Sequence, residues 1–186
     1  LRDTVAVAGT HGKTTTASML ALVLREAGLR PSFIIGGDVN EIGTGAAWDD
    51  GQIFVVEADE SDGSFLALER RVAVVTNVEP DHLEYHGDFE GLRTAFRRFV
   101  EETDGVTVVG IDDEGGRRLA EGRGVVTVGT SAGASWRLES VDEAWEGVSF
   151  DLAGPGGECL PIQIPLPGLH NARNAAVAAV VGLVVA

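Results

Sequence analysis

The sequence predicts an α/β fold in which a mostly parallel sheet is flanked by helices, with a small antiparallel strand group near the C-terminal third. Two observations favour this class. Up to Val128, short valine-rich apolar runs alternate with helical stretches, which is typical of strands buried on both faces of a parallel sheet. After Gly129, strand-like runs are separated by clusters of glycine and proline, as in antiparallel hairpins.

Local signals place each element. Continuous apolar runs predict strands at Val5–Ala8, Ser32–Ile35, Ile53–Val56, Val72–Thr76, Val106–Val109 and Val125–Val128. Helical spacing predicts helices at Lys13–Ala27, Phe89–Glu102 and Asp113–Gly122, the first of them stopped by Gly28. The antiparallel group is expected at Ser135–Val141, Gly147–Leu152 and Leu160–Ile164, and a last helix follows a Pro-Gly turn and runs through Asn174 to Ala186.

Composition narrows the classes of partner. The 186 residues carry a net charge of −15, and such a surface repels nucleic-acid backbones and anionic membrane surfaces. We therefore expect no nucleic acid and no membrane as partner. The single cysteine, Cys159, has no internal partner for a disulfide, which fits a cytoplasmic protein. No signal peptide or membrane-spanning run is evident, because the longest apolar stretch is too short.

The two ends suggest a piece of a longer protein. The chain has no initiator methionine, and a strand-like run begins almost at once. The last apolar helix reaches the end without a capping residue. We therefore expect residues 1–186 to form a central domain with folded sequence on both sides.

A strand, a glycine turn and a helix surround Gly9-Thr10-His11-Gly12-Lys13-Thr14. This order is that of a P-loop, in which backbone N–H groups and a helix start face phosphate oxygens. Lys13 would reach the β- and γ-phosphates of ATP, and the hydroxyl of Thr14 would bind Mg²⁺. The first glycine comes later than in the common motif, so a plain strand–turn–helix junction is the alternative. Lys13 is also the only lysine of the chain.

Acidic and histidine residues follow the next strands. Glu57 ends the apolar run that begins at Ile53, which is where a nucleotide-binding sheet presents a Mg²⁺ ligand. Asp59, Glu60 and Asp62 follow it, and a solvated acidic loop is the simpler interpretation for these three. His82 lies just past another strand, on the same expected edge. His86 is expected to be a surface residue, since a zinc site with His82 lacks a third ligand.

The last helix opens with His170-Asn171-Ala172-Arg173-Asn174. Asparagine is a good N-cap, so capping is one explanation for Asn171. An amide that both donates and accepts hydrogen bonds also suits the edge of adenine.

With these segments the chain resembles the Mur ligases of peptidoglycan synthesis. The resemblance rests on motifs that occur in order along nearly the whole chain: Gly9 to Thr16, Glu57 to Asp62, Thr76 to His82, Gly87 to Phe89 and Pro167 to Asn174. It implies a three-domain, ATP-dependent amide ligase of which this chain is the central domain, between a UDP-sugar domain and an amino-acid domain. It also implies that the late glycine of the loop is the family's own form.

The resemblance assigns roles to residues. Lys13 would stabilise the transferring phosphoryl group, Thr14 and Glu57 would hold one Mg²⁺ ion, and His82 would hold a second. His170 and Asn174 would contact adenine, while Thr10, His11 and Thr15 belong to the loop that binds the phosphates. In such ligases ATP activates a substrate carboxylate as an acyl phosphate, which the amine of an amino acid attacks.

The branch that adds L-alanine to UDP-N-acetylmuramate is the most similar. Several members of the family use a carbamylated lysine as a metal ligand, and this chain has no lysine after Lys13. His11 also favours that branch. The ligase that recycles murein tripeptide is an alternative, as are ligases that build polyglutamate or cyanophycin. A nucleotide-binding module without ligase activity is an alternative from another class.

Overall fold

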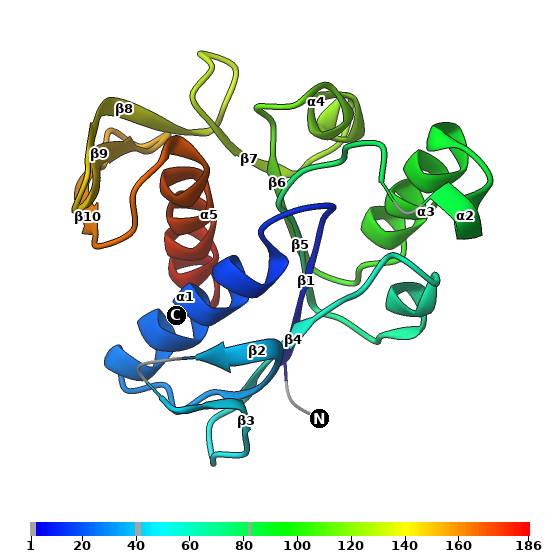
Figure 1. Ribbon diagram of the computed structural model, residues 1–186, viewed down its shortest axis with the longest axis horizontal. Helices are drawn as coiled ribbons and strands as arrows, with labels where there is room; N and C mark the ends of the chain where they lie inside the picture. Colours follow the sequence, from blue (N-terminus) through cyan, green and yellow to red (C-terminus); the bar gives the residue numbers. More distant parts are fainter. Residues whose placement is uncertain (1–2, 40–41, 82) are drawn as a thin grey trace.

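A computed structural model describes residues 3–39, 42–81 and 83–186, apart from the side chain of Asp38. The described residues form one sheet of ten strands with helices on both faces (Figure 1). No helix among them is long and apolar enough to cross a membrane.

Six neighbouring strands form the parallel centre of the sheet. In spatial order they are β2 (Ser32–Val39), β4 (Ile53–Glu57), β1 (Asp3–Ala8), β5 (Val72–Val75), β6 (Val106–Gly110) and β7 (Val126–Gly129). Each coincides with a predicted strand to within a few residues. The α/β prediction is therefore confirmed.

Beyond both edges of this centre the sheet becomes antiparallel. Beyond β7 lie β8 (Trp136–Ala144), β9 (Gly147–Ala153) and β10 (Cys159–Ile164), and β8 joins β7 in parallel before the direction alternates. The predicted antiparallel group is thus confirmed, as a continuation of the main sheet. At the other edge β3 (Thr44–Ala47) pairs antiparallel with β2, and the sequence analysis did not predict it.

The two faces of the sheet bury alternate residues of each strand. Val5 and Val7 pack in one core cluster with α1 (Lys13–Glu26) and α5 (Leu169–Val185). Ala6 and Ala8 pack in the other, under three further elements. These are the 3₁₀ turn η1 (Ser64–Ala67), α3 (Phe89–Glu101) and α4 (Glu114–Ala120), and the short α2 (Leu83–His86) precedes α3. Figure 1 shows α1 and α5 side by side on one face.

The helix starts differ between the two faces. Asp88 and Asp113 cap α3 and α4, each accepting a hydrogen bond from a backbone N–H in the first turn. By contrast, the N-cap residues of α1 and α5 are Gly12 and Gly168, and neither helix has a side-chain cap. The first N–H groups of a helix have no intrahelical partner, so the starts of α1 and α5 offer free donors.

The sheet has a topological switch point between β1 and β5. From β1 the chain crosses by α1 towards β2 on one side, and from β5 it crosses by α3 to β6 on the other. In open α/β sheets, ligands bind where the connections diverge in this way, outside the carboxyl ends of the strands.

Candidate nucleotide site

The loop between β1 and α1 lies at the switch point between β1 and β5. Gly9 has φ +133° and Gly12 has φ +80°, backbone conformations that favour glycine. A Cβ on Gly9 would lie 2.0 Å from Oγ1 of Thr76. The loop therefore requires glycine at its first position for both conformation and space.

The segment after β5 holds the loop in place. The backbone N–H of His11 donates to Oδ1 of Asn77 (2.9 Å), and Nδ2 of Asn77 donates back to the carbonyl of His11 (2.8 Å). The hydroxyl of Thr76 donates to the same carbonyl (2.7 Å). Thr10 exchanges two further hydrogen bonds with the backbone of Glu79. The loop is thus fixed by side chains some 65 residues away in sequence, and the start of α1 is left open.

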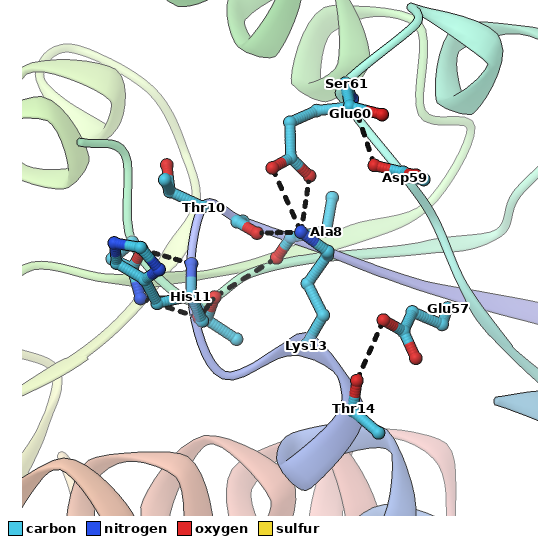
Figure 2. A network of polar contacts seen from close by, with 12 residues as sticks. Ala8, Thr10, His11, Lys13, Thr14, Glu57, Asp59, Glu60 and Ser61 are labelled. Atoms are coloured by element: carbon cyan, nitrogen blue, oxygen red, sulfur yellow. Dashed lines mark hydrogen bonds and ion pairs between the residues drawn. The ribbon is translucent and has the colours of Figure 1, made fainter. Parts of the chain in front are cut away.

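Lys13 points to the inner side of the loop. Its Nζ donates to the carbonyl of Gly9 (2.9 Å) and lies 3.0 and 2.9 Å from the two carboxylate oxygens of Glu60. Figure 2 shows this carboxylate facing Lys13, whereas Asp59 turns away. Glu60 is fully buried, so the expectation of a solvated loop is wrong for it. That expectation is confirmed for Asp59 and Asp62, which are exposed.

Thr14 and Glu57 form a second pair of oxygen groups on the other side of Lys13 (Figure 2). The Thr14 hydroxyl donates to Oε1 of Glu57 at 2.9 Å, and the backbone N–H of Gly36 donates to Oε2 at 2.7 Å. The second bond orients the carboxylate so that its other oxygen faces the helix start. Two hard oxygen atoms therefore lie together at the edge of the sheet.

A cavity of about 400 Å³ opens beside the loop. Its polar lining includes His11 and Thr15, together with His170 and Asn174 from the start of α5. Its apolar lining is formed by Ile111, Val128, Leu138 and Val177. A cavity lined by both kinds of side chain suits a ligand that carries both phosphate and a flat base.

Two aspartates follow β6 along the wall of this cavity. Oδ1 of Asp112 accepts hydrogen bonds from the N–H and hydroxyl of Thr130, and Oδ2 lies 2.5 Å from Nε of Arg173 on α5. Asp113 caps α4, and burial raises the pKa of its carboxyl above the ordinary value. These contacts join α5 to the carboxyl ends of β6 and β7.

The structure brings most of the predicted site residues together. The loop from Gly9 to Thr15 meets Glu57 on one side and His170 and Asn174 on the other. His82 lies outside the described residues. His86 is partly exposed, and its Nε2 donates to the carbonyl of Glu60 at 2.7 Å, so it also anchors the acidic loop.

Several residues of the site were missed from sequence. Glu60, Thr76, Asn77, Asp112 and Arg173 all contact the loop or line the cavity. Most lie within the motifs that carried the resemblance. Their contacts join distant parts of the chain, which local sequence patterns do not predict. Only the places of these residues within the family's motifs could have identified them as site residues.

The Mur ligase middle domain family matches residues 7–182. This chain belongs to that family. The UDP-N-acetylmuramate–L-alanine ligase of Salinispora arenicola is 47% identical over 182 residues, which are 94% of this chain and 36% of that protein. The chain thus spans about a third of the length of this curated relative.

Solved Mur ligase structures share the fold. The UDP-N-acetylmuramate–alanine ligase of Thermotoga maritima superposes with a TM-score of 0.85 at 28% identity, covering 99% of this chain and 42% of that one. The UDP-N-acetylmuramate:L-alanyl-γ-D-glutamyl-meso-diaminopimelate ligase of Neisseria meningitides gives 0.81 at 31%, covering 98% and 61%. The middle domain is therefore a recurrent unit within longer ligases.

Proposed function

We propose that this chain is the central, ATP-binding domain of an amide ligase that joins L-alanine to UDP-N-acetylmuramate. The observation that carries the proposal is the phosphate loop, with Lys13 on its inner side and the Thr14–Glu57 pair beside it. His11 and Gly12 of the same loop line the cavity. The 47% identity to L-alanine-adding ligases supports the choice of substrates. The domains for the UDP-sugar and for the amino acid would flank residues 1–186.

The residues fit ATP with Mg²⁺. No side chain caps the start of α1. Phosphate oxygens would accept hydrogen bonds from the backbone N–H groups of its first turn. Mg²⁺ usually has one or two protein oxygen ligands and completes its shell with water and phosphate. Thr14 and Glu57 supply two such oxygens 2.9 Å apart.

The base would lie against the apolar side chains of the cavity, and His170 and Asn174 would contact it from α5. His11 and Thr15 would contact phosphate oxygens, as would the backbone N–H of Gly12. Thr10 would keep the loop in shape, since its N–H donates to the carbonyl of Asn77 (3.2 Å) and its hydroxyl donates to that of Glu79. His82 remains a proposed ligand of a second Mg²⁺ ion. The metal ions would neutralise the charge of the phosphates. This is needed because the chain itself carries a net charge of −15 and would otherwise repel an anionic ligand.

Each residue then has a part in the chemistry. A carboxylate oxygen of the muramate would attack the γ-phosphorus, and ADP would leave as an acyl phosphate forms. Lys13 would stabilise the negative charge on the transferring phosphoryl group through its fixed ammonium. The amine of L-alanine would then attack the acyl carbon, form the amide and release phosphate.

Titration calorimetry of Mg·ATP with the chain tests the loop. We expect Lys13→Ala to weaken binding at least about tenfold, because it removes a charge-assisted contact. Arg71→Ala is the matched control, since it removes the same charge from an exposed side chain at the amino end of β5. Equal affinities for Lys13→Ala and wild type would exclude Lys13 from phosphate binding.

A second assay tests the ligase activity. We expect the three-domain enzyme to release phosphate only when UDP-N-acetylmuramate and L-alanine are both present. Phosphate release with a murein tripeptide in place of L-alanine would favour the recycling ligase. This chain is 31% identical to the Neisseria meningitides ligase structure. Nucleotide binding without phosphate release under any of these conditions would favour a non-catalytic module.

A further inference from the structure

We propose that Glu60 is the positioning residue of Lys13: its buried carboxylate holds the lysine ammonium on the inner side of the phosphate loop. This inference rests on the proposed function of the loop. Glu60 lies three residues past Glu57 and has no assigned part in the chemistry above.

The first observation is burial. The side chain of Glu60 is 1% exposed and that of Lys13 is 13% exposed, and both carboxylate oxygens lie within 3.0 Å of Nζ. A carboxylate buried in this way is costly unless it is paired. A buried ion pair is seldom more stable than well-packed apolar side chains. Stability alone therefore gives little reason for this pair at the nucleotide site.

The second observation is that the backbone of Glu60 is itself anchored. Its carbonyl accepts hydrogen bonds from Nε2 of His86 on α2 (2.7 Å) and from the N–H of Gly63 (3.2 Å). The neighbouring Asp59 lacks this placement, because it is exposed and accepts only from the N–H of Ser61 among the bonds described for it. The loop thus presents one fixed carboxylate to Lys13.

The third observation is the arrangement of the ammonium. Lys13 is held from two sides, by the carbonyl of Gly9 and by Glu60. A free lysine side chain samples many rotamers, and fixing it in advance removes that cost from ligand binding. Protein kinases use the same device, since a glutamate of one helix must pair with the lysine that contacts the phosphates.

Calorimetry with Mg·ATP tests the proposal on the 186-residue chain. We expect Glu60→Gln to weaken binding about tenfold, the ratio that corresponds to the side-chain entropy of one lysine. Asp59→Asn removes the same charge from the same loop, and we expect it to leave the affinity unchanged. In a Lys13→Met background, Glu60→Gln should have no further effect on binding, because the residue acts through Lys13.

A spectroscopic measurement reads the position of Lys13 directly. As Lys13 is the only lysine, the chain has a single side-chain ammonium signal in ¹⁵N–¹H correlation spectra. We expect a sharp signal in wild type and in Asp59→Asn, since the ion pair slows hydrogen exchange, and loss of the signal in Glu60→Gln. Thermal unfolding should show Lys13→Met to be less stable than the Lys13→Met, Glu60→Gln double variant, in which no unpaired carboxylate is buried.

The outcomes separate the two proposals. Wild-type chain that fails to bind Mg·ATP would overturn the proposed function, while the ammonium signal would still report on the ion pair. Equal or tighter binding by Glu60→Gln, or an equal loss in the Lys13→Met background, would overturn the role of Glu60 and leave the proposed function standing.

Discussion

Gly9→Ala should damage the phosphate loop more than its conformation alone would suggest. Gly9 has φ +133°, where residues other than glycine are strained by about 1–3 kcal/mol. A Cβ there would lie 2.0 Å from Oγ1 and 2.9 Å from the backbone nitrogen of Thr76. The side chain of Thr76 would have to rotate, and its 2.7 Å hydrogen bond to the carbonyl of His11 would be lost.

The expected loss of unfolding free energy follows from these terms. The lost hydrogen bond contributes about 1 kcal/mol, and crowding against the backbone nitrogen adds about 1 kcal/mol more. With the strain, the total is about 3–5 kcal/mol. The altered turn should also move the start of α1, so Mg·ATP binding should become undetectable by calorimetry.

Urea unfolding of both Gly9→Ala and Gly28→Ala separates the cost of the steric clash with Thr76 from the cost of the backbone conformation. Gly28 has a φ of +76° and no atom within 4 Å of an added Cβ, so its replacement should cost only about 1 kcal/mol. Combining Gly9→Ala with Thr76→Ala should recover part of the loss, because Oγ1 is then absent. Equal losses for Gly9→Ala and Gly28→Ala would refute the argument from close approach.

Two further predictions concern buried charged groups. The folded state binds the Asp113 proton more tightly than the unfolded state does, because burial raises the pKa of this carboxyl. That contribution to stability is present below the ordinary carboxyl pKa and is lost as the pH rises through the raised value. Asp113→Asn should therefore be more stable than wild type at neutral pH. A difference between the urea midpoints of the two proteins that grows as the pH is lowered would contradict this. Arg70 donates to the carbonyls of Leu68 and Phe99 and lies over the Phe99 ring. Arg70→Lys should lower the unfolding free energy by about 2–3 kcal/mol yet leave Mg·ATP affinity unchanged, since Arg70 lies at the amino end of β5; a loss of affinity would show that the two edges are coupled.

The parallel strands could be predicted because most are short apolar runs rich in valine and isoleucine, and most of their residues are buried. β3 could not be predicted, because its sequence Thr-Gly-Ala-Ala has little strand propensity. It forms a strand only because it pairs with β2 in the folded chain. The boundary of β5 was placed one residue too late. The N–H of Thr76 still donates to the carbonyl of Ala8 (3.0 Å), but β5 ends at Val75 and the hydroxyl of Thr76 bonds the phosphate loop.

The candidate site was predictable where a motif fixes local geometry and not where the contact is distant. The loop, Glu57 and the start of α5 were recognisable from their places beside strands and helices. The acidic loop was not, since Asp59, Glu60 and Asp62 are alike in sequence. Only the packing of a partner 47 residues away makes Glu60 buried while its neighbours stay exposed.

The last helix supports the phosphate loop as well as lining the cavity. A Cβ on Gly12 would lie 2.5 Å from Oδ1 of Asn174, so α5 presses a buried amide against the turn that starts α1. The two helices then pack along one face of the sheet, and Arg173 ties α5 to Asp112 at the end of β6. A shift of α5 would therefore move the loop and the cavity wall together. The polar residues that open this otherwise apolar helix all line the cavity, so the start of α5 is the part of the helix that meets the site.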